Sequence, residues 1–203
     1  MKLVFSSSNL EDYLKEVIPT IQFNTPLVQQ QIHQIQSQAP TDEERAKIAF
    51  EIARDEIHHS FDTKNPVVTI NAEDVLLNKE GICFAKSHLL ATLLRGMGIP
   101  TGFCYQRVLR NGKTLEGGHA LHGLNAVYLK EYGWFRVDPR GNKPGIDSQF
   151  SIKEEKLAYP IREELGEMDY PNVFNEPLSS VIKSMLESKT SQDLFFNRPE
   201  FIE

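Results

Sequence analysis

The sequence predicts an α+β fold, with N-terminal helices packed on a small antiparallel sheet. A long apolar helical run, Lys79 to Arg95, starts close to a cysteine and is ended by glycines and Pro100. From Thr101 the apolar residues alternate instead of following a helical period, which is typical of strands. The 203 residues suffice for one domain with a substantial core, so we expect a single domain over residues 1–203.

Composition and charge narrow the class of partner. The formal net charge of −6 argues against nucleic acid or an anionic membrane as the main partner. No apolar run is long enough to span a bilayer, and the first residues lack the apolar segment of a secretory signal, so we expect a cytoplasmic protein. The two cysteines, Cys83 and Cys104, exclude a disulfide framework and a four-cysteine zinc site. One bridge between them stays open, although a reducing compartment disfavours it, and we expect no cofactor or metal.

The N-terminal part of the chain is expected to begin with three short elements. These are a strand at Lys2 to Phe5, a helix near Leu10 to Val17 and a glutamine-rich surface helix over Pro26 to Gln38. Thr41 and Glu44 then fit a capping box, and the apolar spacing that follows extends this helix to His58-His59. The two histidines could suggest a metal, but no further ligands accompany them, so we interpret them as a solvated helix end.

The cysteine is expected to stand at the start of the buried helix. A loop over Phe61 to Thr69 and a short helix over Glu73 to Leu77 lead to Gly81, which we expect to allow a sharp turn before Cys83. The N-terminus of a helix carries partial positive charge and free N–H groups. A thiol there loses its proton more easily than a free thiol and lies beside donors for an oxyanion.

The C-terminal half is expected to supply the sheet. Four strands are predicted, at Thr101 to Leu109, Ala120 to Leu129, Trp134 to Val137 and, at the sheet edge, Phe150 to Lys156. The Asn-Gly pair at Asn111 is a hairpin signal between the first two strands. Glu163 to Pro177 is predicted to be irregular and Leu178 to Leu186 helical. The aromatic C-terminal tail should pack back on the domain, with a homodimer contact as the alternative.

The turn at Lys130 to Gly133 brings a histidine and an aspartate together. Folding two strands back around this turn sets His122 across from a position near Asp138. An aspartate there would fix the imidazole tautomer and stabilise its protonated form. If the sheet packs on the start of the cysteine helix, His122 can reach Cys83, which gives a nucleophile, a base and a group that orients the base.

Other residues compete for these roles. His119 lies three residues before His122, so in an extended strand its side chain faces the other way, and we favour His122 as the base. Cys104 is interpreted as a small core residue of a strand, and His88 as a packed, hydrogen-bonded core histidine. Trp134 and Tyr105 could line a pocket, but core packing explains them equally well.

Several short motifs together resemble the core signature of the transglutaminase-like superfamily. They are Ala53-Arg54-Asp55-Glu56-Ile57, Ala72-Glu73-Asp74-Val75-Leu76, Gly81-Ile82-Cys83, Lys86-Ser87, Leu94 to Pro100, His122 to Tyr128, Gly133-Trp134 and Val137-Asp138-Pro139. The resemblance covers about residues 42–143 and leaves a C-terminal extension over 157–203. It implies a papain-like α+β core and a catalytic triad of Cys83, His122 and Asp138. Where many members have His-Ala-Trp, this chain has His122-Gly123-Leu124, and it lacks the paired-cysteine zinc motif of the deglycosylating members.

The expected function is cysteine-dependent acyl transfer on an amide or peptide carbonyl through a thioester. Hydrolysis of a peptide, protein or small amide substrate is the preferred outcome. Protein cross-linking by an amine acceptor, or chemistry like that of the arylamine N-acetyltransferases that share the core, are the enzymatic alternatives. A non-catalytic binding module that retains the fold is the alternative from another class.

Overall fold

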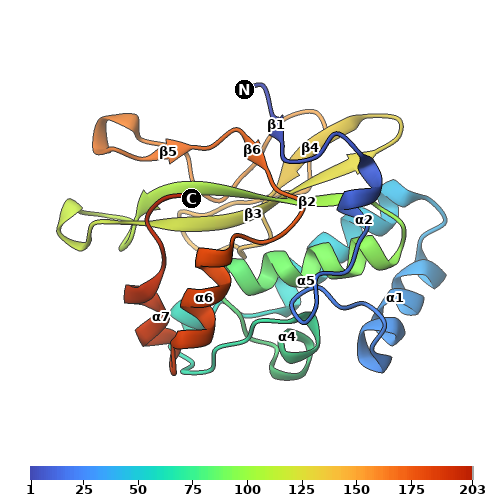
Figure 1. The fold of residues 1–203 in the computed structure, drawn as a ribbon, viewed down its shortest axis with the longest axis horizontal. Coiled ribbons are helices and arrows are strands. Elements are labelled where there is room, and N and C mark those ends of the chain that lie inside the picture. The colour runs from blue at the N-terminus through green and yellow to red at the C-terminus, as the bar shows by residue number, and fades with distance from the viewer. Residues whose placement is uncertain (203) are drawn as a thin grey trace.

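The computed structural model describes residues 1–202 and has the α+β architecture expected from the sequence. A four-stranded antiparallel sheet in the order β4-β3-β2-β5 lies on one side of the molecule, and the helices lie on the other (Figure 1). A second, two-stranded parallel sheet pairs β1 with β6. The strands are β1 Val4–Phe5, β2 Thr101–Leu109, β3 His119–Leu129, β4 Gly133–Val137, β5 Met168–Asp169 and β6 Asn172–Val173.

The helices include two long ones that were predicted with their correct ends, α1 and α5. The α-helices are α1 Pro26–Gln38, α2 Asp42–Glu51, α3 Ser60–Thr63, α4 Ala72–Asn78, α5 Cys83–Gly96, α6 Ser179–Glu187 and α7 Ser191–Asn197. Short 3-10 turns are η1 Leu10–Tyr13, η3 Leu115–Gly117 and η4 Glu163–Leu165, and η2 Ile52–Glu56 is a π-helical turn. None of the helices in residues 1–202 has the length and apolarity that crossing a bilayer requires.

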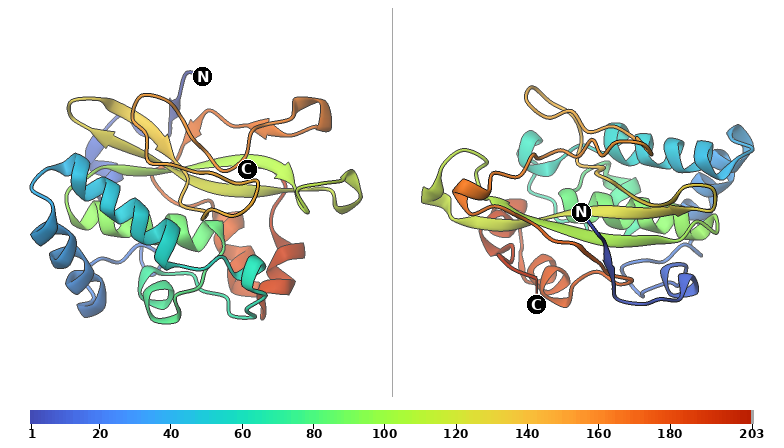
Figure 2. Two further views of the ribbon diagram at one scale, coloured as in Figure 1. Left: turned by 180° about the vertical axis from the view of Figure 1, so that it is seen from behind. Right: turned by 90° about the horizontal axis from the view of Figure 1, so that it is seen from above.

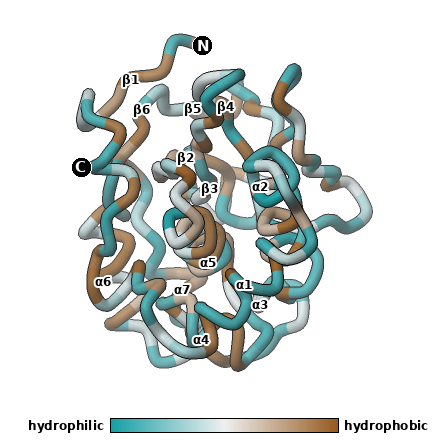
Figure 3. Tube along the Cα trace, turned by 90° about the vertical axis from the view of Figure 1, so that its right-hand side faces the viewer, coloured by the Kyte–Doolittle hydropathy of each residue, from teal (hydrophilic) through white to brown (hydrophobic). Residues whose placement is uncertain are grey.

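Helix α5 is the centre of the core. Every residue from Cys83 to Arg95 is buried, and the helix lies between the sheet and the other helices as a largely hydrophobic rod (Figure 3). Seen from behind, α2 runs along α5, and α4 packs on it as well (Figure 2). A helix enclosed on all sides cannot shift without opening the core, so its first residue is held rigidly.

The predicted capping box is present, but the helix that it starts ends early. The Thr41 hydroxyl accepts from the backbone N–H of Glu44, and the Glu44 carboxylate accepts in return from the Thr41 backbone. After Glu51 the helix widens into the π turn η2 and ends at Glu56, not at His58-His59. A buried lysine, Lys86, donates to the carbonyls of Arg54 and Ile57 and so satisfies backbone groups that the π turn leaves free.

The prediction of an edge strand at Phe150 to Lys156 is wrong. That segment has no regular structure, and the sheet edge is taken by β5, which lies in the stretch predicted to be irregular and pairs Asp169 with Gln106 of β2. Buried Arg136 of β4 holds this arrangement together, because it forms ion pairs with both Asp169 and Glu155 at 2.7 Å. The sheet edge therefore depends on contacts between residues distant in the sequence, which local propensity does not report.

The C-terminal tail packs back on the domain as predicted, and it forms the helix α7. Thr190 and Asp193 make a capping box at its start, and the Phe195 ring lies 5.3 Å from the Phe61 ring. Beyond α7 the carbonyl of Pro199 accepts a 2.7 Å hydrogen bond from the N–H of Leu121 in β3. The tail thereby reaches the sheet edge next to the predicted site.

Candidate active site

Cys83 is the first residue of α5, as predicted. Its side chain is 2% exposed and lies at the bottom of a cavity of about 630 Å³. As the first helical residue it has a backbone N–H with no partner inside the helix. Gly81, however, does not supply an unusual turn, because its φ is not positive; a Cβ there would lie 3.0 Å from the Ala85 Cβ and 3.2 Å from the Thr69 hydroxyl, so the packing is tight.

His122 and Asp138 are brought into direct contact. His122 Nε2 lies 2.7 Å from Asp138 Oδ2, and both side chains are buried. The last ladder pair of β3 and β4 is Asn125 with Val137, so Asp138 follows the end of β4 and is not directly opposite His122. Its carboxylate accepts further hydrogen bonds from the N–H groups of Arg140 at 3.1 Å and Ala158 at 3.0 Å.

The thiol lies at an open edge of β3. Strand β4 pairs with β3 only between Asn125 and Leu129, which leaves the first half of β3 without a neighbour on that side. The N–H groups of Leu121 and Gly123 point to this edge, because alternate residues of a strand donate to the same side. Leu121 donates to the C-terminal tail, and the N–H of Gly123 is among the groups that lower the pKa of the Cys83 thiol. The sulfur therefore lies beside the strand that carries His122.

The electrostatics favour a thiolate and an imidazolium. Burial raises the pKa of the Cys83 thiol, but the charge and hydrogen bond of His122 lower this pKa by more, so it ends below its ordinary value. Burial lowers the pKa of His122, but Asp138 and Cys83 raise it to about 9. Burial likewise raises the pKa of Asp138, but His122 and two backbone N–H donors bring it below its ordinary value. All three shifts favour the charged forms at neutral pH.

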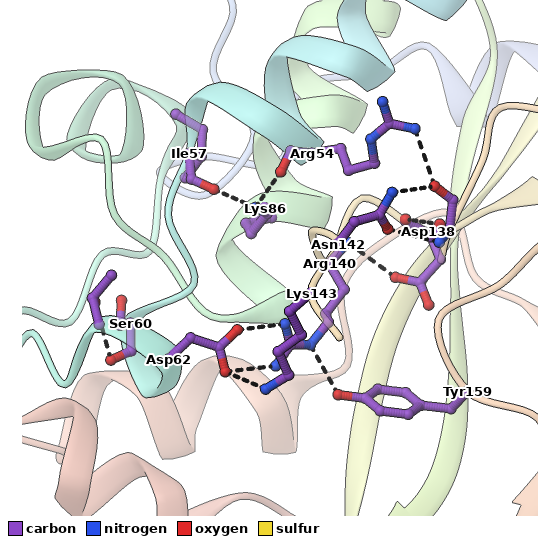
Figure 4. A network of polar contacts seen from close by, with 12 residues as sticks. Arg54, Ile57, Ser60, Asp62, Lys86, Asp138, Arg140, Asn142, Lys143 and Tyr159 are labelled. Atoms are coloured by element: carbon purple, nitrogen blue, oxygen red, sulfur yellow. Dashed lines mark hydrogen bonds and ion pairs between the residues drawn. The ribbon is translucent and has the colours of Figure 1, made fainter. Parts of the chain in front are cut away.

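Residues that the sequence analysis did not single out complete the site. The ring of Tyr159 packs edge-on against the His122 ring at a centroid distance of 4.8 Å. The Tyr159 hydroxyl accepts from Arg140 Nε at 2.9 Å, and Arg140 also forms an ion pair with Asp62 at 2.6 Å (Figure 4). This network holds Tyr159 over the imidazole. Segment 158–159 has no local motif, so nothing in the sequence could have identified it.

The competing residues lie elsewhere. His119 Nε2 is 2.8 Å from the Leu165 carbonyl, and His88 Nδ1 is 2.8 Å from the Ile70 carbonyl in the core, as predicted for both. Cys104 is fully buried, burial raises its pKa to about 12, and both cysteines are free.

The interpretation of His59 as a solvated helix end is wrong. Because α2 ends early, His59 is buried and lines the cavity of Cys83.

Gly123 fixes the distance between strand and helix. A Cβ at this position would lie 2.7 Å from Cδ1 of Phe84, the residue that follows Cys83. We expect Gly123→Ala to lower the free energy of unfolding by about 1–3 kcal/mol and to slow alkylation of Cys83 by about tenfold, because Phe84 must move. Chemical denaturation and mass spectrometry of iodoacetamide-treated protein measure the two effects.

A second substitution tests that explanation. The Gly123→Ala, Phe84→Leu double variant has room for the added methyl group, so it should recover part of both losses. Equal stability and equal alkylation in Gly123→Ala and the unsubstituted protein would show that the close approach is not needed.

Comparisons with known proteins agree with this fold. The Transglutaminase-like superfamily profile matches residues 29–139, and no curated protein sequence matches the chain. A Cytophaga hutchinsonii structure with the provisional name cysteine protease has a TM-score of 0.52 at 13% identity, covering 66% of this chain and 43% of its own. The TgpA periplasmic domain from Pseudomonas aeruginosa has a TM-score of 0.46 at 17% identity, covering 66% of this chain and 48% of its own.

This chain spans less than half the length of these two structures, and the likeness to the first is one of fold. The match to the superfamily profile, by contrast, is a match of sequence. It covers more than half of the chain and includes Cys83, His122 and Asp138. The protein therefore belongs to the transglutaminase-like superfamily.

Proposed function

We propose that the protein is an enzyme that transfers an acyl group from an amide or peptide through a thioester on Cys83. One observation carries this proposal: Cys83 lines a cavity at the start of α5, and His122, bound to a buried Asp138, lowers the pKa of its thiol. A buried cysteine with only a structural role gains nothing from a charged neighbour, because burying charges costs free energy.

The residues suit the steps of such a reaction. The Cys83 sulfur attacks the carbonyl carbon, and the backbone N–H of Cys83 at the start of α5 is available to the developing oxyanion. The His122 imidazolium then gives its proton to the leaving amine as the carbon–nitrogen bond breaks. Since Nε2 of His122 is engaged by Asp138, Nδ1 is the nitrogen that faces the sulfur. Asp138 orients the ring and stabilises its charge throughout.

We propose water as the acyl acceptor, so that the thioester is hydrolysed to a carboxylic acid and the free thiol. The substrate would be a peptide, a protein or a small amide. An amine in place of water would give cross-linking or acylation of an arylamine by the same first step. These outcomes differ only in the second half of the reaction, so one experiment can separate them.

The test is turnover of a panel of peptide and acyl amides, followed by mass spectrometry of the acyl-enzyme and products. We expect at least one substrate to acylate Cys83 and Cys83→Ala to lower turnover by about a thousandfold or more. Reaction in ¹⁸O-labelled water should place the label in the released acid. Added amines should leave most of the product as acid if water is the acceptor.

A Cys104→Ala variant serves as the matched control, because Cys104 lies in β2, packs in a separate apolar cluster from Cys83 and should not affect turnover. Absence of any acyl-enzyme across the panel, together with full biological activity of Cys83→Ala in cells that need the protein, would favour a non-catalytic binding module. An acyl-enzyme resolved mainly by amines would instead make the protein a cross-linking or N-acylating enzyme.

A further inference from the structure

The cavity above Cys83 is cationic although the whole chain carries a net charge of −6. Among residues 1–202 its lining has two carboxylates, and both are paired: Asp62 with Arg140 and Lys143, and Glu167 with Arg162. Its cationic lining residues are Arg110, Lys113, Arg140, Lys143, Arg162 and Arg198. The cavity therefore holds an excess of positive charge in a protein of the opposite sign, which favours an anionic ligand.

Arg198 is the cation best placed to bind one. It follows α7, is more than nine-tenths buried, and its guanidinium lies 5.0 Å from the ring centroids of both Phe61 and Phe195. Two of its nitrogens donate to the carbonyls of Phe195 and Arg110. The third nitrogen of the Arg198 guanidinium, Nη1, has no hydrogen-bond partner within residues 1–202. No carboxylate within these residues forms an ion pair with Arg198. A fixed, buried guanidinium with one free edge is a strong site for a carboxylate.

Arg198 and Cys83 line the same cavity and influence each other's charge. Burial lowers the pKa of Arg198 to about 10, so the group is still charged at neutral pH, while Cys83 raises this pKa. The influence is mutual, because Arg198 is among the groups that lower the pKa of Cys83. Because Arg198 and Cys83 line the same cavity, an anion on Arg198 would share that cavity with the sulfur.

His59 adds a second unsatisfied group to the same cavity. It is more than nine-tenths buried and lines the cavity, yet its Nδ1 has no hydrogen-bond partner among the described residues. Burial, with Arg140, Lys86, His122 and Arg198 nearby, lowers the pKa of His59 well below its ordinary value, so the ring is neutral. A neutral ring can present an N–H to a bound acceptor. A buried polar atom left unpaired is costly, which a ligand would correct.

We propose that Arg198 and His59 form an anion-binding subsite next to Cys83, and that the substrate carries a carboxylate close to the carbonyl that is attacked. The proposal rests on the acyl-transfer function proposed above and specifies its substrate class: acidic acyl groups, or peptides cut near a free carboxyl end. The guanidinium edge binds the carboxylate, the His59 N–H adds one hydrogen bond, and the scissile carbonyl is held over the sulfur.

Two alkylating agents of nearly equal size test the subsite without a substrate. Iodoacetate carries a carboxylate and iodoacetamide a neutral amide, and with both the Cys83 sulfur forms a carbon–sulfur bond as iodide leaves. We expect the iodoacetate-to-iodoacetamide rate ratio at Cys83 to exceed that of 2-mercaptoethanol by about tenfold or more. The iodoacetate rate should saturate with concentration, and succinate should protect Cys83.

Variants assign this preference to Arg198. Arg198→Met should return the ratio to that of 2-mercaptoethanol, Arg198→Lys should give an intermediate ratio, and His59→Phe should lower it by a smaller factor. Because the ratio cancels any change in thiolate content, it does not move when a variant merely weakens the nucleophile. The matched control is Lys113→Met, which removes an exposed charge from the cavity rim and should change the ratio little.

The outcomes separate the two proposals. Rapid iodoacetamide labelling with no iodoacetate preference and no saturation overturns the subsite and leaves the acyl-transfer proposal standing. An iodoacetate preference that survives Arg198→Met also overturns the subsite. So does a preference that falls equally in Lys113→Met, because the summed positive charge of the cavity would then be responsible. Failure of Cys83 to react with iodoacetamide near pH 6 counts against the nucleophile itself. If Arg198→Met does not fold, saturation and succinate protection of the unsubstituted protein decide the question.

Discussion

Alkylation of Cys83 by iodoacetamide at pH 6 should slow by about a hundredfold or more when His122 is replaced by alanine. Only the thiolate reacts, and at this pH His122 supplies the main charge that keeps the proton off the sulfur. Without it, burial is the dominant influence and raises the pKa of the thiol. Each unit by which that pKa rises above the pH costs about tenfold in thiolate.

The measurement is the second-order rate constant for modification of Cys83 from pH 5 to 10, followed by mass spectrometry. The unsubstituted protein should already react at pH 6, and His122→Ala should react appreciably only near or above pH 9. The control variant is His119→Gln, since His119 lies on the same strand but is bound to the Leu165 carbonyl. It should leave the profile unchanged. Two superimposable profiles for the unsubstituted protein and His122→Ala would refute the ion pair.

The elements of this fold that could be predicted are those fixed by local pattern. The ends of α1, α5 and β2 follow from a proline, from glycines and from the change of hydrophobic period, and the structure has them as expected. The His122 and Asp138 contact could also be predicted, because a short turn limits how far two strands can slide. Continuing the observed ladder would set Asp138 across from Leu124, two residues from His122, and an offset of two residues keeps the side chains on the same face.

The parts that could not be predicted depend on distant residues. The early end of α2 requires a π turn whose carbonyls are satisfied by Lys86, 30 or so positions later, and that change is what buries His59. Arg198 joins the lining of the Cys83 cavity because α7 packs on α3 and the tail meets the edge of β3. The capping box at Thr190 and Asp193 could have revealed α7. No local signal places Arg198 beside a thiol more than a hundred residues earlier.

These omissions share a physical origin. Apolar periodicity reports which face of an element is buried, but a cavity is lined by residues from many elements that share no local pattern. Tyr159, Arg140 and His59 come from three separate segments, and each is explained only by what it contacts across the cavity. The sequence can therefore predict that Cys83, His122 and Asp138 meet, whereas the other residues that line the cavity emerge from the packing.

Replacement of Asp138 by alanine should lower the free energy of unfolding by about 3–5 kcal/mol at pH 7, measured by urea denaturation. The carboxylate is fully buried, and its loss leaves the His122 imidazolium without a counter-charge and the N–H groups of Arg140 and Ala158 without an acceptor. Asp147→Ala removes an exposed carboxylate from the same loop and should change stability by less than about 0.5 kcal/mol.

The pH dependence of this loss separates charge from packing. Because the folded pKa of Asp138 lies below its ordinary 3.8, its contribution is fully present above about pH 4 and declines as the pH falls through the folded value. The difference between the unsubstituted protein and Asp138→Ala should therefore shrink in acid. Asp138→Asn retains an acceptor oxygen and should recover part of the stability, yet it cannot stabilise the imidazolium, so Cys83 should still alkylate slowly at pH 6. A loss of stability independent of pH, together with rapid alkylation in Asp138→Asn, would mean that Asp138 only fills space beneath His122.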